Sequence, residues 1–185
     1  MCRKLSGIIE KLANILNPKL EAQDADAAVA LILKIENQET EVFLVKRAEY
    51  PSDPYSGQIA LPRGKRNLED KNLKQTVVRE TLEETNVNLL ESCRFLGTMD
   101  VLESTLSPKM NVLPFVALLI HEPLIKLNNE LQDYIWIPIG RLYQHESTAK
   151  FSFGMFPAYI VDSIVIWGLT YRILKKLINV FKQPQ

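Results

Sequence analysis

The sequence predicts an α/β fold in which a mixed β-sheet lies between layers of helices. Two observations carry this prediction. Apolar or alternating runs typical of strands precede and follow one central helical run, and a second run near the C-terminus repeats its apolar residues at helical spacing. The 185 residues, 46% of them hydrophobic, suffice for one domain with a real core, and no repeat, low-complexity segment or linker divides them.

The first expected element is an amphipathic helix over residues 1–20. Its apolar residues recur at helical spacing, but charged residues interrupt them, and it lacks the apolar core and cleavage site of a signal peptide. We expect this helix to pack on its own domain, with a membrane-surface or homodimer role as the alternative. Asn17-Pro18 ends the pattern.

A β-hairpin is expected next. Residues 27–35 form an apolar run typical of a buried strand, and residues 41–47 alternate between apolar and polar positions. The polar residues 37–40 separate the two runs, so we expect a turn there.

A Gly/Pro-rich loop and a helix follow, and together they occupy residues 57–87. Glycines in the loop, residues 57–64, permit close approach of the backbone to a ligand, and Pro62 stiffens it. The helix is expected over about residues 72–85, with Asp70 in the N-cap region and residues 86–88 ending it.

The second half of the chain is predicted to complete the sheet and to add a terminal helix. Strands are expected at residues 94–101, 109–120, 134–138 and 152–160, and a short helix at 139–144. A polar loop over residues 103–108 is placed to overhang the site. Asp162 or Ser163 is expected to cap a terminal helix over residues 162–182 that turns an apolar stripe to the core.

Composition excludes several classes of protein. The 22 basic and 22 acidic residues cancel, so the basic surface of a nucleic-acid binder is not expected. Cys2 and Cys93 are too few for a disulfide framework or a zinc site, and they favour a reducing, cytoplasmic compartment. The apolar stretch 151–171 is interrupted by Gly154, Pro157 and Asp162, so we predict no transmembrane segment.

Three carboxylates share one stripe of the central helix. At 100° per residue, Glu83 and Glu84 lie about 60° and 40° to either side of Glu80, and Val78 and Leu82 point the opposite way. Such like charges repel each other on an isolated helix, and a hard divalent cation removes that repulsion. Oxygen ligands of this kind suit Mg²⁺ or Mn²⁺ bound together with substrate phosphates. The alternative is a solvated acidic face without a ligand.

These residues resemble the sequence box of the Nudix hydrolases. The chain supplies Gly64, Arg79, Glu80, Glu83, Glu84 and Val87 in register, with Asp70 near the first acid and one extra residue before the arginine. The loop over residues 56–64, the inserted residue and the tail over residues 165–172 look like the coenzyme A pyrophosphatase branch. The resemblance implies one Nudix domain over residues 1–185 with the Nudix α/β/α sandwich fold.

The chain departs from that pattern at three positions. Arg63 stands where the branch usually has a glycine, and its side chain bears on substrate identity. Asn86 replaces the box glycine and tolerates the left-handed conformation often needed at a helix C-terminus. Thr81 replaces a larger apolar residue, which bears on packing.

The resemblance implies roles for individual residues. Glu80, Glu83 and Glu84 are expected to bind the metal ions, together with the backbone carbonyl of Gly64, and either Glu83 or Glu84 to hold the attacking water. We expect Arg79, on the flank of the acidic stripe, to orient a glutamate.

Four further residues are candidates for the site. Arg63, together with Arg47 and Lys65, is a candidate for contact with the phosphates or a nucleotide, and Glu130 for a further acid or metal ligand. For the basic residues and for Glu130 the alternative is an ordinary solvated side chain.

Two classes of function follow. The first is a Mg²⁺- or Mn²⁺-dependent hydrolase of the diphosphate in coenzyme A or its thioesters, with ADP-ribose, other nucleoside diphosphate derivatives and normal or oxidised nucleoside triphosphates as alternative substrates. The second is a non-catalytic nucleotide-binding module of the same fold. Such modules typically lose box glutamates, and this chain keeps three, so the enzyme is favoured.

Overall fold

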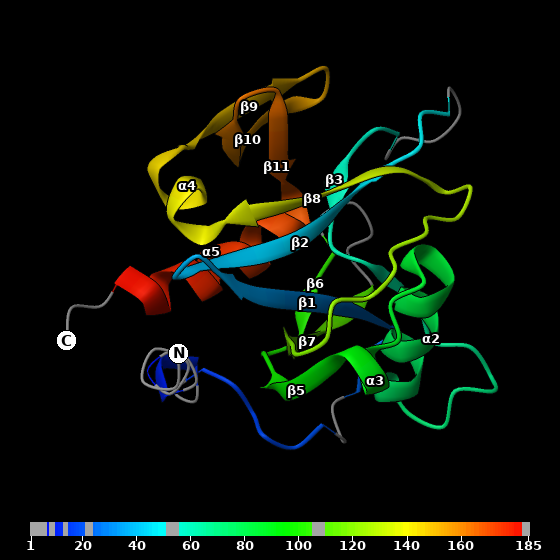
Figure 1. The fold of residues 1–185 in the computed structure, drawn as a ribbon. Coiled ribbons are helices and arrows are strands. Elements are labelled where there is room, and N and C mark those ends of the chain that lie inside the picture. Colours follow the sequence, from blue (N-terminus) through cyan, green and yellow to red (C-terminus); the bar gives the residue numbers. More distant parts are fainter. Residues whose placement is uncertain are drawn as a thin grey trace.

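The computed structural model describes residues 7, 10–12, 15–20, 24–50, 56–104 and 110–182 of the chain. Within these residues the fold is an eight-stranded mixed sheet, a three-stranded antiparallel sheet and four helices labelled α2 to α5 (Figure 1). This confirms the predicted α/β class with a mixed sheet.

The predicted hairpin is confirmed at the centre of the large sheet. β1 (Ala27–Glu36) and β2 (Glu39–Arg47) pair antiparallel, and the turn residues Asn37 and Gln38 both have positive φ. β1 also pairs in parallel with β7 (Asn111–Leu119), which makes the sheet mixed. A strand covered on both faces is expected to be apolar throughout, and the first seven residues of β1 are buried.

β1 and β2 diverge beyond their hairpin pairing, and the segment 58–65 lies between them. Within it, β3 (Ile59–Ala60) pairs with β2, and β4 (Arg63–Lys65) pairs with β1. Two further backbone bonds fix the segment, because the Arg47 N–H donates to the Gln58 carbonyl and the Ala30 N–H to the Pro62 carbonyl. We call residues 58–65 the wedge. The sequence predicted only a loop here, since strands of two and three residues leave no periodic pattern.

The remaining strands of the large sheet lie on its two sides. β8 (Leu131–Pro138) pairs antiparallel with β2, and it begins three residues before the predicted strand. β5 (Cys93–Thr98) and β6 (Leu102–Glu103) pair antiparallel with β7.

The C-terminal third has the predicted short helix and last strand, as α4 and β10, but differs from the prediction around them. β9 (Glu146–Phe151), β10 (Gly154–Val161) and β11 (Ile164–Trp167) form the small sheet after α4 (Ile139–Gln144), and α5 runs over Gly168–Lys182. The expected helix start at Asp162 or Ser163 is wrong, because Asp162 has a φ of 53° in the turn between β10 and β11. The bulky, β-branched run Ile164–Trp167 pairs with β10 and delays the helix to Gly168.

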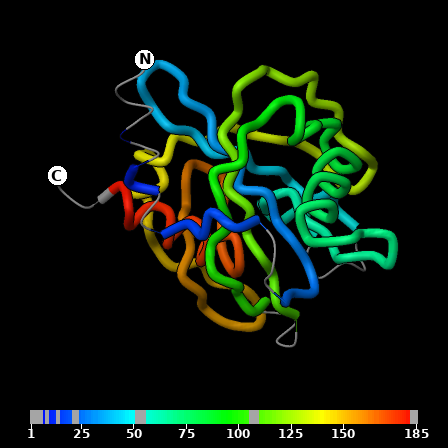
Figure 2. The backbone as a smooth tube through the Cα atoms, turned by 90° about the horizontal axis from the view of Figure 1, so that it is seen from below, coloured from blue at the N-terminus to red at the C-terminus, as the bar shows by residue number. Residues whose placement is uncertain are grey.

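Two apolar clusters cover the two faces of the large sheet. On one face Leu31 and Leu44 pack with Ile173 and Leu177 of α5. On the other face the cluster includes Phe43 and side chains of α2 (Leu73–Thr85) and α3 (Leu89–Ser92). Figure 2 shows α2 and α5 on opposite sides of the strands, as a layered α/β/α arrangement requires.

Half of the expected helix over residues 1–20, namely residues 1–6, 8, 9, 13 and 14, lies outside the described residues. Residues 10–12 are helical, and Leu12 and Leu16 are buried in the cluster that contains α5. In the described part of the chain, no helix has the length and apolar character that crossing a membrane requires.

Candidate metal and diphosphate site

Helix α2 carries the glutamates, and its two ends are capped by side chains or backbone geometry. The Asn72 side chain accepts the Gln75 N–H at 3.0 Å, so the N-cap is Asn72, and Asp70 lies two residues before it in the N-cap region. Asn86 takes the left-handed C-cap conformation with a φ of 60°, as expected for that position. The helix bounds agree with the prediction.

The acidic stripe lies at the boundary between the buried and exposed sides of α2. Glu84 is 6% exposed and packs under the wedge, whereas the Glu83 side chain is 55% exposed. Leu82, which the sequence places opposite the stripe, is 41% exposed. The buried side is instead rich in threonine, at Thr76, Thr81 and Thr85, which lets the polar stripe approach the sheet.

Arg79 holds the loop and the acidic stripe together. Its guanidinium forms a bidentate pair with Asp70, with Nε–Oδ1 at 3.1 Å and Nη2–Oδ2 at 2.8 Å. Nη1 also donates to Glu80 Oε1 at 2.7 Å and to Glu83 Oε2 at 3.1 Å, and Nη2 to the Lys65 carbonyl at 3.1 Å. The expected orientation of glutamates by Arg79 therefore has a direct geometric basis.

Two contacts join the wedge to the glutamates. The Arg63 N–H donates to Glu84 Oε2 at 3.0 Å. A Cβ atom on Gly64 would lie 1.8 Å from Glu80 Cδ, so only glycine leaves room for that carboxylate. The box glycine thus has a steric reason that is independent of any metal.

Burial and neighbouring charges set the proton affinities of the acids. Burial is the main cause that raises the pKa of the Glu84 carboxyl to about 7; the Arg63 N–H opposes the rise, and the charges of Glu80 and Glu130 add to it. Burial also raises the pKa of Glu80, although Arg79 opposes this. The hydrogen bond from Arg79 lowers the pKa of Asp70 to about 2.

A cavity of about 420 Å³ opens beside the wedge and collects most of the candidate residues. Its charged lining residues are Arg47, Arg63, Lys65, Glu80, Glu84 and Glu130. Gly64 also lines it, and so do residues that the sequence did not single out, Ala27, Ser104, Met110 and Val112. These four come from strands and a loop that only the sheet brings together, and no motif marks them. The rest of the loop expected to overhang the site, residues 105–108, lies outside the described residues.

Arg79 and Glu83 do not line this cavity. Across the ranges that the structure describes, no group of three or more acidic, histidine or cysteine side chains is arranged as a ready metal cage. The three glutamates do not converge because they bind different partners. Glu80 and Glu83 accept hydrogen bonds from Arg79, and Glu84 accepts one from the Arg63 N–H.

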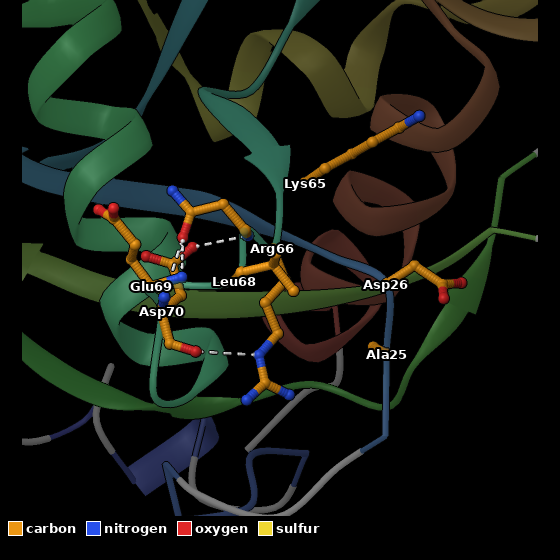
Figure 3. A pocket seen from close by; sticks show the side chains of 8 residues that line it. Ala25, Asp26, Lys65, Arg66, Leu68, Glu69 and Asp70 are labelled. Atoms are coloured by element: carbon orange, nitrogen blue, oxygen red, sulfur yellow. Dashed lines mark hydrogen bonds between the residues drawn. The ribbon is translucent and has the colours of Figure 1, made fainter.

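The loop between the wedge and α2 borders a wide, shallow cavity of about 990 Å³ (Figure 3). Lys65 and Arg66 point in opposite directions there, and Arg66 donates to the Asp70 and Lys71 carbonyls at 3.2 and 2.9 Å. The Asn67 side chain accepts the Asp70 N–H at 2.8 Å. These bonds hold Asp70 in the position where it meets Arg79.

Comparison with known proteins identifies the family. The NUDIX domain profile matches residues 25–159, which include the wedge, α2 and every residue of the site. The chain belongs to the Nudix family. This confirms the predicted family.

Two relatives are informative in sequence. An uncharacterised protein of Schizosaccharomyces pombe is 36% identical over 115 residues, which are 59% of this chain and 35% of that protein. The peroxisomal coenzyme A diphosphatase ndx-8 of Caenorhabditis elegans is 27% identical over 176 residues, 88% of this chain and 74% of that protein. The chain therefore spans about a third of the first relative and three quarters of the second.

Solved Nudix structures share the fold. The MutT protein of Methanosarcina mazei Go1 has a TM-score of 0.55 and 22% identity, and the match covers 89% of this chain and all of that one. An Ap4A hydrolase complex of Caenorhabditis elegans has a TM-score of 0.52 and 23% identity over 62% of this chain and 80% of that one. The predicted Nudix fold is confirmed.

Proposed function

We propose that this protein is a divalent-metal-dependent Nudix hydrolase that cleaves a diphosphate linkage, most specifically that of coenzyme A or its thioesters. The observation that carries the proposal is the 420 Å³ cavity, whose lining sets three basic side chains beside three carboxylates around Gly64. Basic side chains suit the anionic diphosphate, and the carboxylates would suit a divalent cation.

The residues fit a divalent cation. Glu80, Glu83 and Glu84 offer carboxylate oxygens from one stripe of α2, and Gly64 on β4, which lies against Glu80, offers its backbone carbonyl. An all-oxygen donor set is the one that Mg²⁺ and Mn²⁺ prefer. When bound, such a cation neutralises charge on the phosphoryl oxygens and activates water near neutral pH.

The side chains of the site have different roles in the proposed reaction. Arg79 keeps Glu80 and Glu83 oriented while Asp70 anchors Arg79. Glu83 or Glu84 holds the attacking water, and Glu130, which also lines the cavity, serves as a further base or ligand. Arg47, Arg63 and Lys65 bind the phosphates.

Coenzyme A is the preferred substrate because the chain aligns over 88% of its length with the worm coenzyme A diphosphatase. The loop before Gly64 resembles the same branch. Arg63 replaces the usual glycine of this branch, and its residue lines the cavity. The alternative substrates are therefore ADP-ribose, other nucleoside diphosphate derivatives and nucleoside triphosphates. A non-catalytic binding module is disfavoured because all three box glutamates are present.

The test is hydrolysis by the purified protein with Mg²⁺ or Mn²⁺, with the products of coenzyme A, ADP-ribose and nucleoside triphosphates separated by chromatography. Adenosine 3',5'-bisphosphate from coenzyme A supports the proposal. Preference for another substrate rejects the coenzyme A assignment, and no turnover of any substrate rejects the enzyme.

Matched variants test the site residues. Glu83→Gln and Glu84→Gln should each abolish metal-dependent turnover in a folded protein, and Glu69→Gln, an exposed change outside the stripe, should not. Undiminished activity of either box variant would remove that glutamate from the mechanism.

The proposal includes a cytoplasmic location and, as an alternative to a monomer, a homodimer. The low cysteine content favours a cytoplasmic protein, whereas the word peroxisomal describes the worm relative. Size-exclusion chromatography with light scattering tests the homodimer alternative.

A further inference from the structure

One end of the 420 Å³ cavity has a lining unlike the rest. The charged lining residues come from β2, the wedge, α2 and the turn before β8, whereas β1 and the β6–β7 hairpin contribute Ala27, Val112, Met110 and Ser104. None of these four carries a charge, and the proposed chemistry uses none of them. The same cavity therefore has a charged part and a neutral part.

Strand pairing places the neutral part at a distance from the glutamates. β4, β1, β7 and β6 lie side by side in a row through Lys65, Ala27, Val112 and Leu102. Neighbouring strands are about 4.8 Å apart, so three spacings put β6 about 14 Å from β4. Gly64, which lies against Glu80, is on β4. A ligand group at Ser104 is therefore one that the diphosphate carries, not the diphosphate itself.

The Ser104 hydroxyl is available to such a group. Ser104 is 6% exposed and lines the cavity. Its N–H donates to the Met110 carbonyl at 2.9 Å, but among the residues that the structure describes no hydrogen bond reaches its side chain. Leaving a buried hydroxyl unpaired costs free energy, and a ligand that hydrogen-bonds to it in the cavity removes that cost.

Hydrogen bonds from neighbouring elements fix the backbone around Ser104. Arg172 of α5 donates through Nη1 to the Glu103 carbonyl at 2.7 Å, directly before Ser104. Opposite Glu103, the Asn111 carbonyl accepts the Asp26 N–H at 2.9 Å, and Asp26 Oδ2 accepts the Asn111 N–H at 2.7 Å. The position of the hydroxyl is therefore set before any ligand binds, by contacts that do not involve the Ser104 side chain.

We infer that Ser104 is a specificity-determining residue whose hydroxyl hydrogen-bonds an uncharged polar group in the organic part of the substrate, and that Arg172 positions it. This rests on the proposed function for the place of the diphosphate. The aliphatic side chains of Ala27, Met110 and Val112 suit the apolar surface around such a group. The group comes from either side of the diphosphate, from a nucleoside or from an amide-bearing chain, and the experiment distinguishes the two.

The experiment measures the binding of two halves of coenzyme A, adenosine 3',5'-bisphosphate and 4'-phosphopantetheine, by calorimetry with Mg²⁺. Neither fragment contains a diphosphate linkage, so binding is measured without turnover. In Ser104→Ala, one fragment should bind about three- to tenfold more weakly, as expected for the loss of one hydrogen bond, and the other should bind as before. Ser92→Ala, a matched buried serine on α3 that does not line the cavity, should leave both affinities unchanged.

Arg172→Met tests the positioning role. It should weaken the same fragment as Ser104→Ala, and the double variant should lose no more than Ser104→Ala alone, because both changes act on one contact. Arg141→Met, which removes an exposed ion pair with Asp162, is the matched control and should change neither affinity. Weaker binding of both fragments, with losses that add to those of Ser104→Ala, would show a general structural effect and remove Arg172 from the inference.

The pattern over the two fragments decides the role of Ser104. A loss confined to one fragment in Ser104→Ala supports it and identifies the half of the substrate that lies there. An equal loss for both fragments or no loss for either overturns it, as does the failure of both fragments to bind the native protein. A selective loss in a protein that hydrolyses no diphosphate would reject the proposed function and keep Ser104 as a binding residue.

Discussion

Arg79 is the residue on which the arrangement of the site depends most directly. It reaches Asp70, Glu80 and Glu83 at the same time, and Asp70 is 6% exposed. A buried carboxylate is stable as an anion only when it is paired and hydrogen-bonded. The pair therefore serves both the stability of the loop and the orientation of the glutamates.

Replacing Asp70 by Asn should lower the free energy of unfolding by about 2–4 kcal/mol at pH 7, because Arg79 loses a buried charge partner. Folding lowers the pKa of Asp70 from 3.8 to about 2, so its stabilising contribution is complete above pH 4 and is lost as the pH falls through 2. Urea unfolding at pH 7 and at pH 2–3 checks this. A difference that stays constant down to pH 2 would contradict the charge-based explanation.

Gly64→Ala should displace the Glu80 carboxylate, because the added Cβ would lie 1.8 Å from Glu80 Cδ. An error of this size in a catalytic group costs about 100-fold in rate, so kcat should fall by about that factor. The matched control is Gly140→Ala on α4, where an added Cβ meets nothing within 4 Å. Steady-state kinetics of both variants make the comparison, and equal activity would contradict the steric role of Gly64.

At the scale of the element, α2 ends where Asn86 adopts the left-handed conformation. The Asn86 N–H donates to the Leu82 carbonyl at 2.8 Å, and its side chain donates to the Leu124 carbonyl at 3.0 Å. The cap therefore also fixes the loop that runs back toward β8 and Glu130.

Asn86→Ala should destabilise the protein by about 1–2 kcal/mol, since alanine adopts the left-handed conformation less easily and loses the bond to Leu124. Asn86→Gly keeps the backbone freedom and should cost less. Chemical denaturation of the two variants separates the effects. If glycine proved as damaging as alanine, the side-chain bond, which both variants lose, rather than the backbone conformation would dominate.

The β10–β11 hairpin shows how an element can be misassigned from its pattern. Ile166 fits the apolar stripe of the following helix, and it is also buried as part of strand β11. A short apolar run fits both the helical and the strand periodicity. Its antiparallel pairing with Ala158–Val161 makes it a strand.

At the scale of the whole molecule, the wedge connects the two layers of the core. Its side chains alternate between the α2 cluster, through Ala60, and the α5 cluster, through Ile59 and Leu61. Metal binding between the wedge and α2 would therefore stabilise the fold as a unit.

Mg²⁺ or Mn²⁺ should raise the Tm of the protein, because a ligand that binds only the folded state stabilises it by about 2.7 kcal/mol at 100 times its dissociation constant. Glu84→Gln should greatly reduce this shift, while Glu69→Gln should retain it. Differential scanning fluorimetry with and without EDTA measures both. An undiminished shift in Glu84→Gln would locate the ion elsewhere.

Several parts of the fold and site followed from local patterns. The hairpin, the bounds of α2 and the left-handed Asn86 depend on neighbouring residues, and the structure has them where they were expected. The pairing of Asp70 with Arg79, the short strands of the wedge and the start of α5 were missed because each depends on contacts between two segments, which the periodicity of one segment does not record.

The sequence by itself determined the family, the α/β class and the acidic stripe, because box residues at fixed spacing and helical periodicity are properties of a local segment. Only the tertiary structure decided which basic side chains and which fourth acid, Glu130, face the stripe. These residues lie on β2, on the wedge and before β8. Sheet pairing, which no local pattern records, brings them around one cavity.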